Sequence, residues 1–318
     1  MISIIIPYFD SFSTIHKAVQ SVFLEFKKYN FEIIVVNDGS SDNLEALLVD
    51  FYGNSRLKII NQVNQGVSSA RNTGIERARG KYIFFLDADD YFNKINLKEI
   101  FKEFKMGSEL VCFGYTAVDE NYHSKKSLLP NLNLHIANKR LIYHDIFCEQ
   151  TIGGHVTNKV FLKEIISKNN LLFPENVDFA EDLVFCGQYI EHIQNVSVIQ
   201  KSMYGFLLHK ESIRGSSQHP TNEQLIKLSS IVDANNIFQN LDIDSYSRHW
   251  FASETFYMFS SLLAKNRFWV DESTKNVLIS KKNYIRKEII TFLFFPHSRF
   301  SIFQKVLGIA RFWGIINK

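Results

Sequence analysis

Three carboxylates stand close together after a short apolar run in residues 81–91, KYIFFLDADDY. Residues 82–86 are aromatic and β-rich, which predicts a buried strand, and Asp87, Asp89 and Asp90 follow at its carboxyl end. Carboxylates at this spacing raise one another's pKa unless a cation or hydrogen-bond donors compensate. Hard oxygen ligands in this position suit Mg²⁺ or Mn²⁺ carrying a phosphate. A solvated acidic turn that caps the next helix has the same pattern, so the surrounding sequence must decide.

The segments before this turn predict a parallel α/β sheet. Apolar strands are expected at residues 2–6, 31–36 and 57–60, with helices at 11–29, at 44–52 and from the segment after residue 64 to near 80. Strands that alternate with helices form βαβ units, whose strands are parallel. Open α/β sheets bind ligands at the carboxyl ends of their strands. Pro7, Asp38 and the acidic turn are therefore expected to share one crevice.

Two polar segments flank this crevice. Asp38 begins the turn DGSSD, where it is either a functional carboxylate or simply a turn residue. Residues 64–74, NQGVSSARNTG, lead into a helix and place Arg71 one to two turns inside it. There Arg71 either reaches a phosphate or a base edge, or forms a surface salt bridge. No GxGxxG or P-loop pattern occurs, which argues against a dinucleotide site or an ATPase.

The middle of the chain carries a second acidic pair. Glu181 and Asp182 open a helix that is expected to run to about residue 192, although acids at a helix start also need no function. The flanking pattern predicts strands at 110–118 and 196–206, helices at 142–149 and 162–169, and a flexible polar crossing at 121–138.

Composition limits the class of protein. With 318 residues, 46% apolar and 22% charged, the chain is long enough for one large packed domain with an appendage, or for two domains. Three cysteines without a CxxC pair indicate a reducing compartment. The start MISIIIPYF lacks a basic region and is expected to be a strand, not a signal peptide, and no spanning helix is expected. A net charge of +3 is too small to imply nucleic acid as a partner.

The last part of the chain is basic and aromatic. Residues 281–318 contain eight basic side chains and one acidic one. Residues 301–316 place polar side chains on one helical face and Trp, Phe and Ile on the remainder. This pattern suits the interface of an anionic membrane, but a helix packed on the catalytic domain has the same pattern. A contact between copies of the chain is equally open.

Four motifs follow one another along the chain: SIIIPYFD, EIIVVNDGSSD, NQGVSSARNTGIERARGKYIFFLDADDYF and FAEDLVF. Together they resemble glycosyltransferase family 2, of the type that builds bacterial capsule, exopolysaccharide or lipopolysaccharide. The resemblance is strong over residues 1–92, fair to about 215 and absent beyond. It implies a GT-A fold, which is a Rossmann-like α/β sheet with helices on both faces, over residues 1–215. Residues 216–318 are then a helical extension.

The resemblance also implies which residues bind the donor. In the half formed by residues 1–92, Pro7 begins the nucleotide pocket, Asp38 faces the uracil edge, Arg71 borders the nucleotide and Asp87 approaches the ribose. The full set of nucleotide-sugar residues is Pro7, Tyr8, Phe9, Asp38, Arg71, Asp87, Ala88 and Lys159. The donor is expected to be a UDP-sugar.

Metal and catalytic roles follow from the same resemblance. Asp89 is expected to hold Mn²⁺ or Mg²⁺ against the diphosphate, with Asp90 as a supporting acid and His209 completing the metal shell. In the acceptor half, residues 93–215, Asp182 is the expected general base and Glu181 the reserve. A carboxylate within hydrogen-bond reach is needed because the acceptor hydroxyl has a pKa far above 7.

The expected activity is inverting transfer of a hexose or N-acetylhexosamine from UDP to a lipid-linked or growing glycan. The protein is expected to be cytoplasmic and peripheral on the inner face of the cell membrane. One alternative is a UDP-sugar-binding subunit of a glycan-assembly complex that does not turn over. Another is a nucleotidylyltransferase, but the glycine-rich and basic loop expected after its first strand is missing from PYFDSFST.

Overall fold

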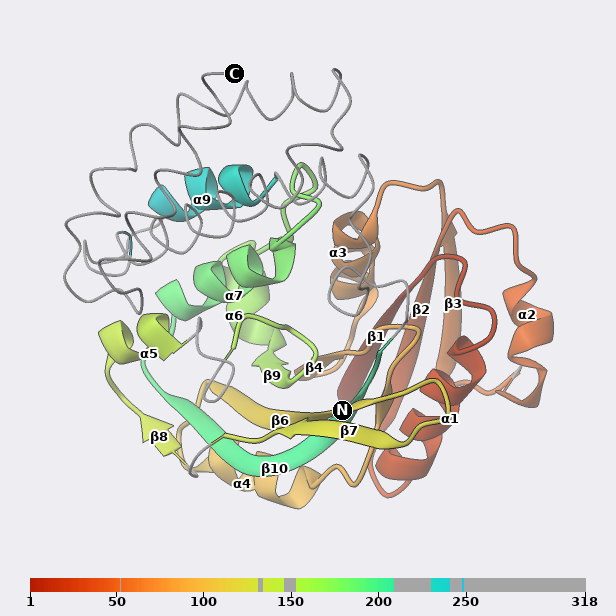
Figure 1. The fold of residues 1–318 in the computed structure, drawn as a ribbon, viewed down its shortest axis with the longest axis horizontal. Coiled ribbons are helices and arrows are strands. Elements are labelled where there is room, and N and C mark those ends of the chain that lie inside the picture. The colour runs from red at the N-terminus through yellow and green to blue at the C-terminus, as the bar shows by residue number, and fades with distance from the viewer. Residues whose placement is uncertain (52, 131–133, 146–152, 209–229, 241–247, 249–318) are drawn as a thin grey trace. The chain divides into compact units, whose positions relative to one another are not determined.

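A computed structural model describes the chain except for residues 52, 131–133, 146–152, 209–229, 241–247 and 249–318 (Figure 1). The chain divides into two compact units. The first comprises residues 1–175 and 185–209, and the second comprises residues 176–184 and 210–318. The boundary predicted at residue 215 and the amphipathic segment 301–316 lie outside the described residues. No helix in the described part of the chain is long and apolar enough to span a bilayer.

The first unit begins with the predicted parallel sheet. Its strands are β1 (Ile2–Tyr8), β2 (Phe31–Asp38), β3 (Leu57–Gln62) and β4 (Tyr82–Phe85), in the order β3-β2-β1-β4. All three neighbouring pairs are parallel, which confirms the βαβ prediction. β1 and β2 are buried along their whole length, as expected for central strands covered on both faces.

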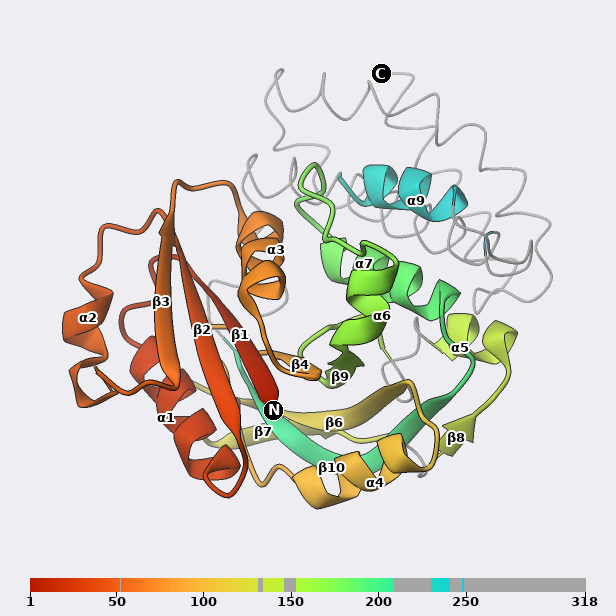
Figure 2. The same ribbon diagram turned by 180° about the vertical axis from the view of Figure 1, so that it is seen from behind.

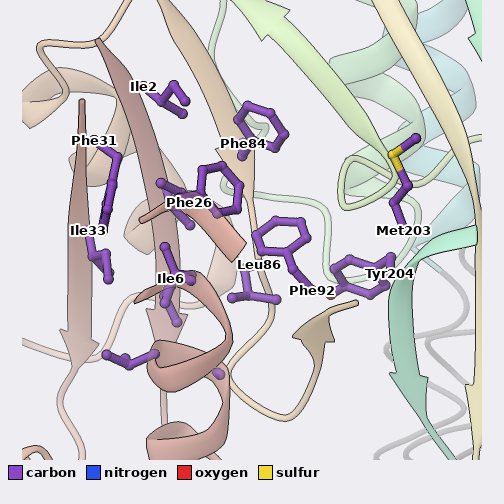
Figure 3. Close-up of a cluster of buried hydrophobic side chains, with 14 of the residues drawn as sticks. Ile2, Ile6, Phe26, Phe31, Ile33, Phe84, Leu86, Phe92, Met203 and Tyr204 are labelled. Carbon is purple, nitrogen blue, oxygen red and sulfur yellow. The ribbon is translucent and has the colours of Figure 1, made fainter. Parts of the chain in front are cut away.

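Helices α1 (Ile15–Phe26) and α3 (Val67–Arg77) cover opposite faces of this sheet (Figures 1 and 2). Alternate β1 side chains such as Ile6 join the buried cluster that contains Phe26 of α1 (Figure 3). Ile5 points the other way, toward Gly74 of α3. A Cβ at Gly74 would lie 2.3 Å from Ile5 Cγ2, so glycine lets α3 approach the strand.

The helix predicted at 44–52 is shorter than expected. α2 (Leu44–Leu47) ends early, and a 3₁₀ turn (Val49–Phe51) follows it. Leu48 leaves the helical backbone angles and is fully buried, and the ring of Phe51 stacks on Phe23 of α1 at 4.9 Å. Packing against α1 therefore overrides the local helical pattern.

The sheet continues beyond β4 with strands that run in both directions. In spatial order these are β9 (Lys159–Leu162), β6 (Leu110–Val118), β10 (Val196–Leu207) and β5 (Tyr91–Phe92). β9 is antiparallel to β4 and β6, β10 is parallel to β6, and β5 is antiparallel to β10. The sequence predicted β6 and β10 but not β5, β9 or helix α4 (Leu97–Lys105), which Asn96 caps through the Glu99 N–H.

The prediction of a flexible crossing at residues 121–138 was wrong. β7 (Ser124–Leu128) pairs antiparallel with β6, and β8 (Leu134–Ile136) pairs antiparallel with β10. β7 has polar, exposed side chains, a composition that is typical of strands at a sheet edge and that hides their periodicity.

The remaining helices of the described chain are α5 (Lys139–Asp145), α6 (Lys163–Lys168), α7 (Glu181–Glu191) and α9 (Ile231–Gln239). The helices predicted near 162–169 and from Glu181 are confirmed. α5 starts earlier than the predicted residue 142, and residues 146–149 of that prediction lie outside the described residues. Residues 181–184 of α7 belong to the second unit. Within that unit, the Phe179 N–H donates to Ser230 Oγ at 2.8 Å, just before α9.

Candidate active site

The acidic segment after β4 forms a tight turn in the first unit. The Asp90 N–H donates to the Asp87 carbonyl at 3.0 Å, so Ala88 and Asp89 occupy the two central positions. Ala88 and Asp90 are buried, whereas Asp87 and Asp89 are partly exposed. Two of the three carboxylates therefore reach the surface at the carboxyl end of a parallel strand.

Asp90 is directed into the protein toward β10. It is 2% exposed, and its two oxygens accept hydrogen bonds from the Tyr204 hydroxyl at 2.6 Å and the Leu207 N–H at 2.8 Å. Burial raises the pKa of Asp90 well above its usual value, and the negative charges of Asp89 and Asp87 raise it further. Part of this shift is repulsion among the three carboxylates, which a bound cation would relieve.

Arg71 lies under this turn. Its guanidinium pairs with Asp87 at 3.0 Å and lies 5.2 Å from the ring of Phe173. Arg71 is 3% exposed, so the pair is not the surface salt bridge that the sequence left open. The arginine from α3 holds the Asp87 carboxylate at the site, and its contact with a nucleotide stays a prediction.

Asp38 organises the loop between β3 and α3. Its Oδ1 accepts from Gln62 Nε2 and the Gln65 N–H, both at 2.9 Å, and its Oδ2 accepts from the Gly66 N–H at 2.8 Å. Gly66 is the residue before α3, so the carboxylate lies at the positive end of that helix. Asp38 is more than a local turn residue, because it fixes a loop 24 to 28 residues further along the chain.

The loop after β2 is tight as well. Gly39 has φ +82°, and a Cβ there would lie 2.7 Å from the Asn64 backbone nitrogen. Glycine is therefore required both for the backbone angle and for the close approach of the β3–α3 loop.

The end of β1 lies beside these loops, with Pro7 paired to Val36 of β2. Tyr8 is buried, and its hydroxyl donates to the Asp42 carboxylate. Burial and this bond raise the pKa of Tyr8. Phe9, in contrast, is 49% exposed, which leaves an aromatic ring open to solvent at this edge of the sheet.

Lys159 lies in β9 and is fully buried. Its ammonium donates to the His155 carbonyl at 2.6 Å and to Asn158 Oδ1 at 2.9 Å. Asn158 in turn donates to the Phe113 carbonyl at 3.0 Å. These contacts fix the lysine inside the sheet, and its predicted contact with the donor stays a prediction.

The predicted catalytic pair lies in the second unit. Glu181 and Asp182 form the first turn of α7 and are partly exposed. Their roles as general base and reserve stay predictions. His209, the predicted third metal ligand, lies outside the described residues.

A divalent ion fits the chemistry of the acidic turn. Within the described ranges, no group of three or more His, Cys, Asp or Glu side chains could hold a metal by itself. Mg²⁺ sites that also carry phosphate commonly use only one or two carboxylates, and the partly exposed Asp89 offers one. The donor set is all oxygen, which suits Mg²⁺ or Mn²⁺.

Several residues of the site escaped the sequence analysis. Gln62 and Gln65 hold Asp38, Asp42 holds Tyr8, and Tyr204 holds Asp90. Asp42 ends the DGSSD turn after β2, so the sequence could have suggested it as a site residue. Tyr204 gave no signal, because an aromatic residue inside a strand is ordinarily part of the core.

Comparison with protein families gives a match over half of the chain. The family described as Glycosyl transferase family 2 matches residues 3–168. Among curated proteins, EpsJ of Bacillus subtilis, named an uncharacterized glycosyltransferase, is 29% identical over 212 residues, 64% of this chain and 60% of that protein. TarP of Staphylococcus aureus, a poly(ribitol-phosphate) β-N-acetylglucosaminyltransferase, is 26% identical over 226 residues, 70% of this chain and 66% of that protein. The match thus spans about two thirds or less of each relative.

Solved structures share the fold. Residues 1–349 of S. aureus TarS, crystallised with UDP-GlcNAc, superpose with a TM-score of 0.64 and 20% identity, covering 92% of this chain and 89% of that one. The complex of the same TarS fragment with UDP gives a TM-score of 0.65 at 18% identity, covering 99% and 90%. At this identity the likeness concerns the fold alone, and it confirms the predicted α/β GT-A architecture.

Proposed function

Since this chain belongs to glycosyltransferase family 2, we propose that it transfers a hexose or N-acetylhexosamine from a UDP-sugar to a glycan acceptor with inversion. The observation that carries the proposal is the turn at residues 87–90, which presents Asp87 and Asp89 at the carboxyl end of β4. The names of TarP and of the TarS complexes, which mention N-acetylglucosaminyl transfer, UDP and UDP-GlcNAc, support a donor of this class.

Pro7, Phe9 and Asp38 form the proposed uracil site. The exposed ring of Phe9 offers a face for stacking, which typically contributes about 1–3 kcal/mol per base. Asp38 Oδ2 accepts one hydrogen bond from the protein and retains acceptor capacity for the uracil N3–H. Arg71 holds Asp87 in place, and Asp87 binds the ribose.

Asp89 is the proposed principal metal ligand, with His209 as a second one and Asp90 as a supporting acid behind the turn. A divalent ion held by Asp89 and His209 would offset the negative charge that develops on the diphosphate as UDP leaves. The protein's own part is to fix the turn, so that little reorganisation is needed when that charge appears.

Asp182 is the proposed general base and Glu181 its reserve. A single in-line displacement requires one carboxylate that takes the proton from the acceptor hydroxyl while the sugar–phosphate bond breaks on the opposite face. The proton moves to the carboxylate, the hydroxyl oxygen bonds to the anomeric carbon, and the bonding pair leaves with UDP. No covalent nucleophile is required.

The proposed acceptor is a lipid-linked or growing glycan in capsule, exopolysaccharide or lipopolysaccharide synthesis. The basic and aromatic segment after residue 280 supports action in the cytoplasm at the inner face of the cell membrane. Association of several copies is compatible with the same segment.

UDP release tests this proposal directly. The full chain is incubated with a panel of UDP-sugars and Mn²⁺ or Mg²⁺, first alone and then with a membrane lipid extract as acceptor. We expect UDP release that depends on one donor and rises when acceptor is present. Binding of UDP without release under any of these conditions would favour a binding subunit, and release of pyrophosphate would favour a nucleotidylyltransferase.

A further inference from the structure

Tyr204 of β10 connects both ends of the acidic turn. Its hydroxyl accepts a hydrogen bond from the Asp87 N–H at 3.3 Å and donates one to Asp90 Oδ2 at 2.6 Å. One buried phenol oxygen therefore bridges the first and last residues of the turn, across 114 to 117 positions of sequence. The only residues between these two ends are Ala88 and Asp89.

The surrounding contacts of β10 hold Tyr204 in this position. Its ring is fully buried and meets the ring of Phe92 edge-on, with 5.8 Å between centroids (Figure 3). The next residue, Gly205, pairs with Tyr91 of β5, and a Cβ on Gly205 would lie 2.3 Å from the Tyr91 ring. The Leu207 N–H then binds the other oxygen of Asp90. Strand β10 thus holds Asp90 by two hydrogen bonds and pairs with the two residues that follow it.

These contacts from β10 oppose the repulsion among the three carboxylates of the turn. Asp87, Asp89 and Asp90 lie within one four-residue turn, which the Asp90 N–H closes onto the Asp87 carbonyl. Like charges in a partly buried turn favour conformations in which they separate. A neutral hydroxyl that donates to Asp90 and accepts from the Asp87 backbone stabilises the compact turn without adding charge.

We propose that Tyr204 is a positioning residue for Asp89. By bridging Asp87 and Asp90 it fixes the direction in which the Asp89 carboxylate meets the metal and the diphosphate of the donor. This inference rests on the proposed function, because it assumes that Asp89 binds a divalent ion.

The test uses the full chain and measures metal binding as well as activity. Tyr204→Phe removes only the bridging hydroxyl. Tyr189→Phe is the matched control, because the Tyr189 hydroxyl is also buried, donates to the Glu109 carbonyl at 2.8 Å and accepts from the Leu162 N–H at 2.9 Å. Mn²⁺ affinity is measured by electron paramagnetic resonance, UDP affinity with Mn²⁺ by calorimetry, and stability by urea unfolding.

We expect both variants to lose similar stability, since each loses two buried hydrogen bonds. Only Tyr204→Phe should weaken binding of Mn²⁺ and of UDP with Mn²⁺, by about tenfold, because only there does the lost hydroxyl contact the acidic turn. Asp90→Asn changes the bridge from its other side and also removes a supporting acid, so it should weaken Mn²⁺ binding at least as much. The double variant with Tyr204→Phe and Asp90→Asn should bind Mn²⁺ no more weakly than the single variant with the lower Mn²⁺ affinity, because both changes break the same bridge.

Wild-type affinity in Tyr204→Phe, or an equal loss in Tyr189→Phe, would overturn the positioning role. If Tyr204→Phe does not fold, Asp90→Asn decides, and wild-type Mn²⁺ affinity in that variant would overturn the inference. Failure of the wild-type protein to bind Mn²⁺ or UDP would instead remove the proposed function on which the inference rests.

Discussion

Glu32 links β2 to three other segments at the amino ends of the parallel strands, away from the carboxyl ends where the candidate site lies. It is a buried carboxylate at the start of β2. It accepts hydrogen bonds from Ser3 Oγ of β1 at 2.8 Å, Lys58 Nζ of β3 at 2.8 Å and the Arg79 N–H at 2.7 Å. The Arg79 side chain also pairs with it at 3.1 Å. We expect Glu32→Gln to destabilise the parallel sheet on which the candidate site depends.

The magnitude follows from the pKa of Glu32. Burial alone would raise it, but the hydrogen bonds from Lys58, Arg79 and Ser3 lower it from 4.5 to about 2. This difference of about 2.5 pKa units, at about 1.4 kcal/mol each, sets an upper value of about 3.5 kcal/mol. The side chains of Lys58 and Arg79 are 35% and 63% exposed, so solvent screens the pairs, and we expect about 2 kcal/mol.

The pH dependence has a defined sign. Because the folded pKa is lower than the unfolded one, this stabilisation is complete above about pH 4.5 and is lost as the pH falls toward 2. Urea unfolding of the wild type and Glu32→Gln should differ by about 2 kcal/mol at pH 7 and by less than half of that near pH 3.

Asp50→Asn is the control, because Asp50 pairs with His16 at the surface and should change stability by less than about 0.5 kcal/mol. Two results would refute this role of Glu32: an equal loss of unfolding free energy in both variants, or a loss in Glu32→Gln that is as large near pH 3 as at pH 7.

Two predictions concern the candidate site. In Asp38→Asn an amide NH₂ replaces one carboxylate oxygen and opposes the N–H of Gln65 or Gly66, so calorimetry should show UDP binding at least tenfold weaker; unchanged affinity would exclude Asp38 from the uracil site. Asp182→Asn should leave UDP affinity intact and lower the transfer rate by about 10²–10⁴-fold. Full activity with an unchanged pH profile would reject Asp182 as the base.

The sequence was most informative where structure is local. β1 to β4 are short apolar runs bounded by turn residues. Because parallel strands have their carboxyl ends at the same end of the sheet, the sequence could predict that Asp38 and the acidic turn lie at that end. The ARN segment predicted Arg71 one to two turns inside a helix, and α3 has it there. It could not indicate that the arginine is buried and pairs with Asp87, because that depends on how α3 packs.

The sequence was least informative where a contact joins distant segments. β5 has two residues and β9 has four, one of them a buried lysine, so neither shows a recognisable period. β7 is polar because it lies at an edge. The bridge from Tyr204 to Asp90 spans 114 residues and depends on the pairing of β10 with β5, which no local pattern encodes.

Calorimetric titration of the full chain with UDP, with and without Mn²⁺, tests the central claim most directly. The acidic turn should make binding metal-dependent, so wild-type protein should bind UDP in millimolar Mn²⁺ and bind it much more weakly in EDTA. Asp89→Ala should reduce the affinity in Mn²⁺ to the value in EDTA. Identical UDP affinity in all of these conditions, or no binding by the wild type, would contradict a metal-assisted UDP-sugar site at residues 87–90.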